Sequence, residues 1–299
     1  MRTLEPDRIT VAAATYNRNA DLLFLLRSLE GQRRQFGFTV LVIDNSPNGI
    51  AQDIVADESP MAIYVHEPRP GIVSARNAAL DATRDQQAII FVDDDEYVDE
   101  KWFERLIGCA NDHAAEVVFG PVVPVFGATC PEWIKAGGHF ERHRQTTGTL
   151  VRSGATNNAL IRAEAFQRLD VPRFDAAYSV SGGSDAELFQ RMAAGGSRMV
   201  WCDEAVVFEK VPESRANFAW IWKRQVRVGS VTGLIQLQRH SRVRVIGGAL
   251  SRIMLGSLRS LRALVRLRPL SSRELGPLAR GLGLLGSVIG HRSKEYARS

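Results

Sequence analysis

Apolar runs of strand length alternate with helix-length amphipathic segments in the first part of the chain. The runs typical of strands cover residues 9–14, 39–43, 62–65 and 88–92. The spacing of apolar residues predicts helices over 19–32, 74–84 and 99–111, the first of them capped by Asn19. Because the strands are continuous apolar runs rather than alternating ones, we expect a parallel sheet covered by helices on both faces. The pattern therefore predicts a doubly wound α/β fold.

Polar clusters follow three of the predicted strands, at residues 15–18, 44–46 and 93–95. Ligands bind beyond the carboxyl ends of the strands in an open parallel sheet, so we expect all three clusters at one edge of the sheet. The first strand is followed by neither a glycine-rich dinucleotide fingerprint nor a P-loop motif. We therefore expect a metal ion to hold the phosphate groups instead.

The third cluster consists of three consecutive aspartates, Asp93, Asp94 and Asp95. Like charges this close repel one another and cannot all be buried in ionised form without a counter-charge. Carboxylate oxygens suit Mg²⁺ or Mn²⁺, ions that often share a phosphorylated ligand. The segment therefore indicates a divalent-metal site. The alternative is a solvated acidic turn that caps the helix beginning near Asp99.

The composition is that of a globular protein, with 45% hydrophobic and 24% charged residues among 299. The three cysteines, Cys109, Cys130 and Cys202, are widely spaced and lack zinc-ligand spacing, which favours a reducing, cytoplasmic environment. The first residues contain no apolar stretch typical of a secretory signal. We therefore expect a cytoplasmic protein with a substantial core.

Charge is divided unevenly along the chain. Residues 1–214 carry 21 basic and 31 acidic side chains, whereas residues 215–299 carry 17 and 2. We expect a first domain over 1–230, with halves at 1–115 and 116–230, and a basic helical extension over 231–299.

The basic extension contains two apolar segments, 243–258 and 281–289, which are interrupted by arginine or too short to cross a membrane. Arginines interleave with its apolar residues at Arg239, Arg242, Arg244, Arg252, Arg259, Arg262, Arg266 and Arg268. This pattern predicts an amphipathic helix on an anionic cytoplasmic leaflet, and hence a peripheral membrane protein. The alternative is a helical pair packed on the first domain or on a second copy in a homo-oligomer. No recognition motif for nucleic acid accompanies the charge, so we expect no nucleic-acid partner.

Six motifs follow one another along the chain: TYNR, VIDNS, GIVSARNAAL, FVDDDE, TNNALI and GGSDAEL. In this order they resemble family 2 glycosyltransferases, over roughly residues 8–230. They are similar in particular to bacterial enzymes of exopolysaccharide assembly, such as the succinoglycan glycosyltransferases. The resemblance implies a GT-A fold, with a Rossmann-like, mostly parallel central sheet. It also implies an inverting hexosyltransferase that uses Mn²⁺ or Mg²⁺ and transfers a sugar from a nucleoside-diphosphate sugar, expected to be a UDP-sugar, to a glycan or lipid-linked glycan.

The resemblance assigns nucleotide-sugar contacts to strand ends and to one helix, at Thr15, Tyr16, Asn17, Arg18, Asp44, Arg76, Asp93 and Asp94. Tyr16 would pack on the base, Asp44 would accept a hydrogen bond from uracil, and Asp93 would contact the ribose. Taken alone, the same residues also fit a helix-capping turn at 15–17, an Asx turn at Asp44 and a surface ion pair at Arg76.

The resemblance also implies that Asp95 is a metal ligand and that Asp185 is the general base for the acceptor hydroxyl. The family usually has Glu-Asp where this chain has Ser184-Asp185. The alternative for Asp185 is simple capping of a helix N-terminus. Glu209 stands where many relatives place a metal-binding histidine, and its alternative is an ion pair with Arg215.

Five further side chains are candidates for sugar or phosphate contacts. Asn157 and Asn158 would line the donor or acceptor sugar site, or else satisfy a sheet edge. Trp133 would stack on an acceptor sugar, or else belong to the core. Arg224 and Arg227, three residues apart on a predicted helix, would face the diphosphate, or else lie on a solvated face.

Two other functions stay open from the sequence. One is a catalytically silent relative that binds a nucleotide-sugar or a glycan. The other is a nucleotidyltransferase or phosphotransferase that uses the acidic triplet for chemistry at phosphorus.

Overall fold

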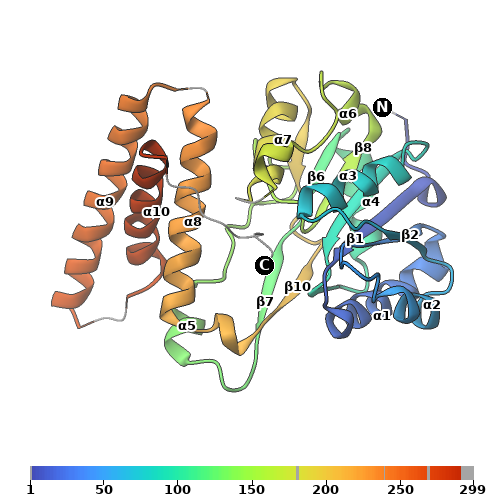
Figure 1. The fold of residues 1–299 in the computed structure, drawn as a ribbon, viewed down its shortest axis with the longest axis horizontal. Helices are drawn as coiled ribbons and strands as arrows, with labels where there is room; N and C mark the ends of the chain where they lie inside the picture. Colours follow the sequence, from blue (N-terminus) through green and yellow to red (C-terminus); the bar gives the residue numbers. More distant parts are fainter. Residues whose placement is uncertain (1, 180–181, 239, 268–269, 291–299) are drawn as a thin grey trace.

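The computed structural model describes residues 2–179, 182–238, 240–267 and 270–290, which form two sheets and a layer of helices (Figure 1). The larger sheet has the strand order β3 (Ile63–His66), β2 (Thr39–Asp44), β1 (Ile9–Thr15), β4 (Ala88–Asp93), β8 (Ala159–Arg162), β6 (Val117–Phe119) and β9 (Met199–Trp201). The smaller sheet has the order β5 (Glu96–Val98), β10 (Val207–Val211) and β7 (Val122–Phe126).

The four strands predicted from apolar runs form the parallel half of the larger sheet. β1 pairs in parallel with β2 and β4, and β2 pairs in parallel with β3. Beyond β4 the sheet becomes mixed, because β8 runs antiparallel to both β4 and β6. The predicted α/β architecture with a mostly parallel sheet is thus confirmed.

Helices cover both faces of the larger sheet, which explains the continuous apolar runs. One buried cluster joins β1 to α1 (Asn19–Phe36) and α4 (Trp102–Asp112), and a second joins the opposite face to α3 (Ile72–Ala82) and α7 (Ser184–Ala194). The short helices are η1 (Pro6–Arg8), α2 (Gln52–Glu58), α5 (Glu132–Ala136), α6 (Ala163–Gln167), η2 (Ala176–Tyr178) and η3 (Glu213–Arg215).

The structure differs from the prediction in the role of Asn19 and in the ends of two helices. The Asn19 side chain does not cap α1 but donates a hydrogen bond to the backbone oxygen of Ile50 at 2.8 Å. The helix then runs on to Phe36, where Gly37 adopts a left-handed backbone with φ 80° that ends it. The third predicted helix, expected to begin at Asp99, begins at Trp102 instead.

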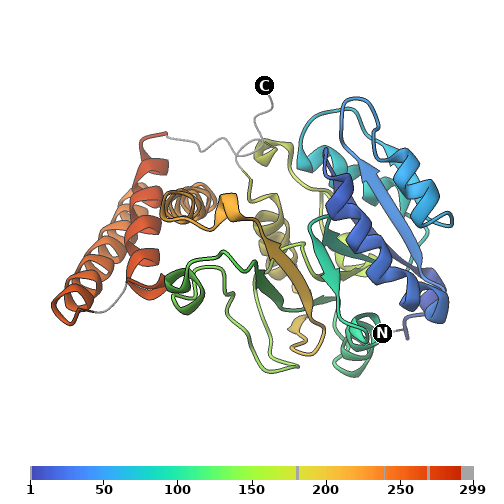
Figure 2. The same ribbon diagram turned by 90° about the horizontal axis from the view of Figure 1, so that it is seen from below.

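The C-terminal part consists of α8 (Phe218–Leu237), α9 (Arg242–Val265) and α10 (Ser272–Val288), with α10 packed against both of the others. These helices form a layer beside the sheets, with α9 on its outer side (Figures 1 and 2). The domain boundary expected at residue 230 falls inside α8. Two of the predicted interleaved arginines, Arg239 and Arg268, lie outside the described residues. Within the described ranges, no helix has the length and apolarity needed to cross a membrane.

Candidate active site

A cavity of about 520 Å³ opens at the carboxyl edge of β1 and β4. Strand ends form one wall, α3 forms another, and β10 with α8 completes it. The lining residues are Ala14, Thr15, Tyr16, Arg18, Asn45, Ile72, Ala75, Arg76, Asp93, Asp94, Asp95, Glu209, Arg215, Trp220, Arg224 and Arg227. Polar clusters that follow different strands therefore meet at one edge of the sheet, as the strand pattern predicts.

Asp94 is the anchored member of the acidic triplet. Its carboxylate accepts hydrogen bonds from Thr15 Oγ1 at 2.8 Å and from Arg18 Nη1 at 3.1 Å. Burial raises the pKa of Asp94 to about 6, with the Asp95 charge acting in the same direction and Arg18 opposing it. Arg18 also donates to Asp95 Oδ2 at 3.1 Å, so one guanidinium holds two of the three aspartates.

Two further carboxyl groups belong to the acidic wall, because Asp93 lines the cavity and the buried Glu96 lies behind it. Burial, reinforced by the Asp95 charge, raises the pKa of Asp93 to about 7 although Arg76 opposes the shift. Glu96 is 1% exposed, and burial raises the pKa of its carboxyl well above the usual value. Glu96 accepts from the backbone N–H of Asp93 at 2.7 Å and from Asn157 Nδ2 at 3.0 Å. These raised pKa values mark a place where added positive charge is electrostatically favourable.

Glu209 faces this cluster from the smaller sheet, where it pairs with Glu96 in the β10–β5 register. Its carboxylate accepts from Arg142 Nη2 at 3.0 Å and from Arg215 Nη1 at 3.5 Å. Arg215 Nη1 also lies 3.4 Å from Asp95 Oδ2, so this guanidinium links the two predicted metal ligands. The ion pair that the sequence offered as the alternative for Glu209 is therefore present.

The donor chemistry of this cluster fits Mg²⁺ or Mn²⁺. Asp93, Asp95 and Glu209 supply carboxylate oxygens, and the raised pKa of Asp93 reflects burial and the repulsion of Asp95. In the part of the chain that the structure describes, no three His, Cys, Asp or Glu side chains gather closely enough to form a ready-made metal site. A bound cation would therefore have to displace the arginine contacts of Asp95 and Glu209.

Arginines of α3 and α8 form a basic wall of the same cavity. Arg224 lies over the rings of Trp220 and Phe140, with its guanidinium carbon 5.4 Å and 5.5 Å from their centroids. Burial lowers the pKa of Arg224 to about 10, and the nearby Arg142 charge adds to the effect. Arg76 and Arg227 line the same space. Such a concentration of guanidinium groups suits a ligand that carries several negative charges.

Asp185 lies in the first turn of α7, close to this wall but outside the list of cavity-lining residues. Its Oδ1 accepts from the backbone N–H of Ala186 at 2.8 Å. The neighbouring Ser184 hydroxyl accepts from Arg76 Nη1 at 3.1 Å, which ties the start of α7 to the cavity. Gly183, with φ 89°, lies so close to α8 that a Cβ there would be 2.2 Å from Val231 Cγ1. The helix that carries Arg224 therefore also supports the loop before Asp185.

Several predicted site residues lie outside the cavity. Asp44 is fully buried and accepts from the backbone N–H groups of Ser46 and Ala51, both at 2.8 Å, and from the Tyr64 hydroxyl at 3.0 Å. Burial by itself raises the pKa of Asp44, but these hydrogen bonds outweigh it and lower the pKa overall. These contacts match the Asx turn that the sequence offered as the alternative for Asp44. The hydrogen bond from the uracil base to Asp44 stays a prediction.

The two asparagines of the predicted sugar site are buried in different surroundings. Asn157 is bound to Glu96 and so lies behind the acidic wall. Asn158 accepts from Trp102 Nε1 at 2.9 Å and donates to the backbone oxygens of Pro121 and Ala205, contacts that brace the sheet edge.

Trp133 and Asn17 also lie off the cavity lining. Trp133 packs edge-on against His139 in a small cluster between α5 and α8. Asn17 is exposed, with a left-handed backbone at φ 54°.

Three charged residues of the site escaped the sequence-based assignments. Glu96 directly follows the aspartate triplet, so its position was the available signal. Arg215 was considered only as the partner of Glu209. Arg142 has no local signal, because it reaches Glu209 from 67 residues away along the chain.

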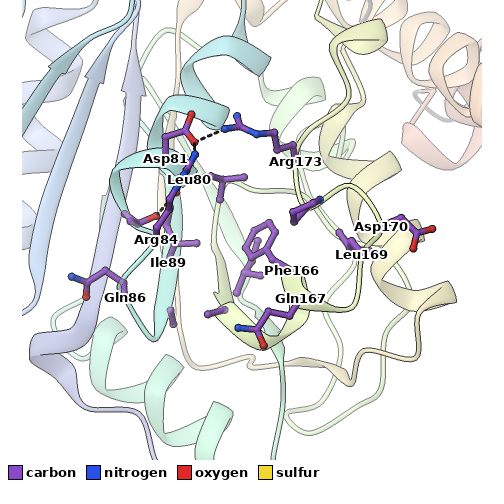
Figure 3. Close-up of a pocket in the computed structure, with 15 residues that line it drawn as sticks. Leu80, Asp81, Arg84, Gln86, Ile89, Phe166, Gln167, Leu169, Asp170 and Arg173 are labelled. Atoms are coloured by element: carbon purple, nitrogen blue, oxygen red, sulfur yellow. Dashed lines mark hydrogen bonds and ion pairs between the residues drawn. The ribbon is translucent and has the colours of Figure 1, made fainter.

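A second cavity, of about 600 Å³, lies at the opposite end of β4 (Figure 3). Leu80, Ile89 and Phe166 give it apolar walls. Asp81 accepts from Arg84 Nη2 at 2.6 Å and also from Arg173, so these three charged groups on its rim pair with one another. Because this cavity is at the amino end of a parallel strand, it is the less favourable place for a substrate site.

Comparison with solved structures defines the class of fold. The crystal structure of Staphylococcus aureus TarS 1-349 in complex with UDP-GlcNAc matches 92% of this chain and 90% of its own, with a TM-score of 0.53 and 15% identity. The crystal structure of GalNAc-T7 with UDP, GalNAc and Mn²⁺ matches 71% of this chain and 45% of its own, with a TM-score of 0.54 and 14% identity. The protein thus has the GT-A fold, as predicted.

Comparison of sequences defines the family. A model of glycosyl transferase family 2 matches residues 10–170. The chain is also 36% identical, over 238 residues, to the succinoglycan biosynthesis protein ExoM of Rhizobium meliloti (strain 1021), covering 77% of this chain and 76% of that protein. The protein therefore belongs to glycosyl transferase family 2, and the predicted resemblance is confirmed.

Proposed function

We propose that the protein is an inverting, metal-dependent glycosyltransferase. It transfers a sugar from a nucleoside-diphosphate sugar, taken to be a UDP-sugar, to a hydroxyl of a glycan or lipid-linked glycan. One observation carries the proposal: the aspartate triplet and the arginines of α3 and α8 share one cavity, beside the start of the helix that bears Asp185. Membership of the family supports the reaction class.

In this proposal the donor's nucleotide lies along the ends of β1 and β4. Tyr16, at the end of β1, packs on the base, and Asp93 contacts the ribose. Arg76, Arg224 and Arg227 donate charge-assisted hydrogen bonds to the diphosphate. Asp95 and Glu209 are the residues that would hold Mn²⁺ or Mg²⁺, an ion that stabilises negative charge on a departing diphosphate.

The acceptor hydroxyl is deprotonated by Asp185, since an unperturbed hydroxyl is too weak an acid to attack at neutral pH. Its oxygen then forms the new bond to the anomeric carbon while the bond from that carbon to the diphosphate oxygen breaks. A single displacement of this kind inverts the configuration at the anomeric carbon. Ser184, which stands where the family usually has glutamate, leaves Asp185 as the carboxylate at this position.

The biological setting is part of the same proposal. The relationship to a succinoglycan biosynthesis protein supports a role in bacterial exopolysaccharide synthesis, and the TarS complex with UDP-GlcNAc supports a UDP-linked donor. We place the enzyme in the cytoplasm, at the inner membrane, where lipid-linked acceptors are accessible.

The test is a panel of UDP-, GDP- and dTDP-sugars, each with Mn²⁺, with Mg²⁺ and with a chelator. We expect one nucleotide class to give metal-dependent release of its nucleoside diphosphate. A protein that neither binds nor turns over any donor in the panel would overturn the proposal. Release of pyrophosphate or phosphate instead would favour a nucleotidyltransferase or phosphotransferase.

The variant Asp185→Asn tests the general base. We expect kcat to fall by about 100- to 10,000-fold, because proton transfer is lost, while donor affinity stays nearly unchanged. The matched control is Asp57→Asn, which alters an exposed aspartate on α2 outside the cavity. If Asp185→Asn turns over donor and acceptor like the wild type, Asp185 is not the base. Donor binding without any turnover in the wild type would instead favour a catalytically silent relative.

A further inference from the structure

An exposed apolar row runs along the whole length of α9. Its members follow one another at intervals of three, four or seven residues, which places them on one face of a helix. They are between 47% and 79% exposed, namely Val243, Leu250, Met254, Leu258, Leu261 and Val265. We call this set the α9 row. An α-helix of 24 residues is about 36 Å long, so the row is an extended surface rather than an isolated apolar residue.

The α9 row lies on the side of the helix that faces away from the protein. The buried residues of α9 are Val245, Ala249, Gly256 and Ala263, and this opposite face packs on α10. At Gly256 the approach is so close that a Cβ would lie 2.4 Å from the backbone nitrogen of Leu278. Figure 1 accordingly shows α9 at the edge of the molecule, beyond α8 and α10.

The charged side chains of α9 itself are all positive, and on the neighbouring α10 Glu274 lies near Arg259, away from the row. The sequence of α9 contains five arginines and no aspartate or glutamate. Arg244 and Arg262 are exposed and lie five helical turns apart, on the same flank of the row, and Arg266 follows just beyond the helix end. An apolar face bordered by arginines matches the boundary between anionic headgroups and acyl chains.

We propose that α9 lies flat on an anionic phospholipid bilayer, with the α9 row among the acyl chains and the arginines against the headgroups. A second copy of the chain is the less favourable occupant of this face. Two α9 helices packed along their rows would bring together the arginines that border each row, Arg242, Arg244 and Arg262, with no carboxylate of α9 to neutralise them. An anionic lipid surface supplies the missing negative charge. The proposal concerns binding alone and does not depend on the proposed reaction.

Helix α9 is connected to the cavity through α10 and α8, which pack closely against each other. α8 carries Trp220, Arg224 and Arg227 in its first half, and its second half packs on α10. A Cβ at Gly229 would lie 2.0 Å from the backbone oxygen of Arg280, and one at Gly233 would lie 2.0 Å from Ser287 Oγ. Contacts this close leave little room for the helices to slide, so docking through α9 sets the orientation of the cavity toward the bilayer.

The test is flotation of the full chain with vesicles of phosphatidylcholine, with and without phosphatidylglycerol. We expect binding that requires phosphatidylglycerol and weakens with salt. The variant Leu250→Glu/Leu258→Glu/Leu261→Glu should weaken vesicle binding by at least about tenfold, because carboxylates would enter the apolar layer. Replacing Arg244, Arg262 and Arg266 by glutamine should weaken it by about fivefold per arginine.

The matched control is Met61→Glu/Val171→Glu, which alters two residues of the first domain that are 71% and 62% exposed and should leave vesicle binding unchanged. Donor hydrolysis without vesicles should be the same in all these variants, which separates this proposal from the catalytic one. Three results would overturn it: no vesicle binding by the wild type, full binding by the glutamate variant of α9, or a dimer in solution that this variant converts to monomers.

Discussion

The carboxylate of Asp44 organises the turn after β2 by accepting three hydrogen bonds from buried groups. In the variant Asp44→Asn, the amide presents a donor where the carboxylate accepted, so at least one buried N–H or O–H loses its partner. We expect the free energy of unfolding to fall by about 1–3 kcal/mol. Chemical denaturation at pH 7 measures this change, and an unaltered midpoint would contradict the structural role.

The same residue gives a pH dependence with a defined sign. The pKa of Asp44 is lower in the folded protein than its ordinary value, because hydrogen bonds to the ionised form outweigh burial. Its stabilising contribution is therefore present above the unfolded pKa of about 3.9 and is lost as the pH falls through the folded value. We expect the stability difference between wild type and Asp44→Asn to narrow toward low pH.

Arg224 is a half-buried cation among other arginines, a costly arrangement that an anionic ligand relieves. We expect Arg224→Gln to weaken UDP binding by about 10- to 100-fold, the equivalent of one charge-assisted hydrogen bond. Titration calorimetry with UDP and Mn²⁺ provides the measurement. Arg144→Gln is the control, because Arg144 pairs with Asp203 outside the cavity. Equal affinity of the two variants for UDP would show that Arg224 does not contact the diphosphate.

At the scale of elements, α8 links the cavity to the helical layer through contacts that tolerate no side chain. A Cβ at Gly283 of α10 would lie 1.8 Å from the backbone oxygen of Val226 in α8. We expect Gly283→Ala to lower the free energy of unfolding by about 1–3 kcal/mol through overpacking, and to weaken UDP binding as α8 moves.

The control for this prediction is Gly31→Ala in the middle of α1, where an added Cβ meets nothing within 4 Å. Alanine is the better helix former, so this variant should be more stable by up to about 1 kcal/mol. Thermal unfolding of the two variants side by side tests the packing argument. A gain in stability for both would show that α8 and α10 are not closely packed in solution.

Predictability from sequence also differs between elements. β1, β2 and β4 have apolar residues at nearly every position, and both faces are in fact covered by helices. The smaller sheet has no comparable signal, because β5 and β10 mix apolar and charged residues over three and five positions. Its pairing of Glu96 with Glu209 depends on contact between segments more than a hundred residues apart.

At the scale of the whole molecule, the acidic wall of the cavity places Asp93 and Asp94 beside Asp95, and burial, with the Asp95 charge acting in the same direction, raises the pKa of both carboxyls. A cation and a diphosphate should therefore bind together more strongly than either does alone. We expect UDP with Mn²⁺ to stabilise the protein by about 2.7 kcal/mol at a hundredfold excess over its Kd.

Thermal unfolding with UDP, with Mn²⁺, with both and with a chelator measures this coupling. UDP in the presence of chelator should give a smaller shift, and Asp95→Asn should reduce the shift caused by the pair. An identical UDP shift with and without metal would show that the arginines alone hold the diphosphate. In that case the site would bind its donor without a cation.

The sequence by itself determined the parallel half of the sheet, the acidic and basic clusters at its edge, the family, and the basic amphipathic C-terminal helices. These features can be predicted because the order of apolar and charged residues within each segment indicates which residues are buried and where charge gathers. The tertiary structure alone decided the rest. It brought Tyr64 to Asp44 and Arg142 and Arg215 to the carboxylates of the cavity, and it placed Gly183 against α8. The reason is that such contacts join residues far apart in the chain, and only the packing of whole elements brings those residues within hydrogen-bonding distance.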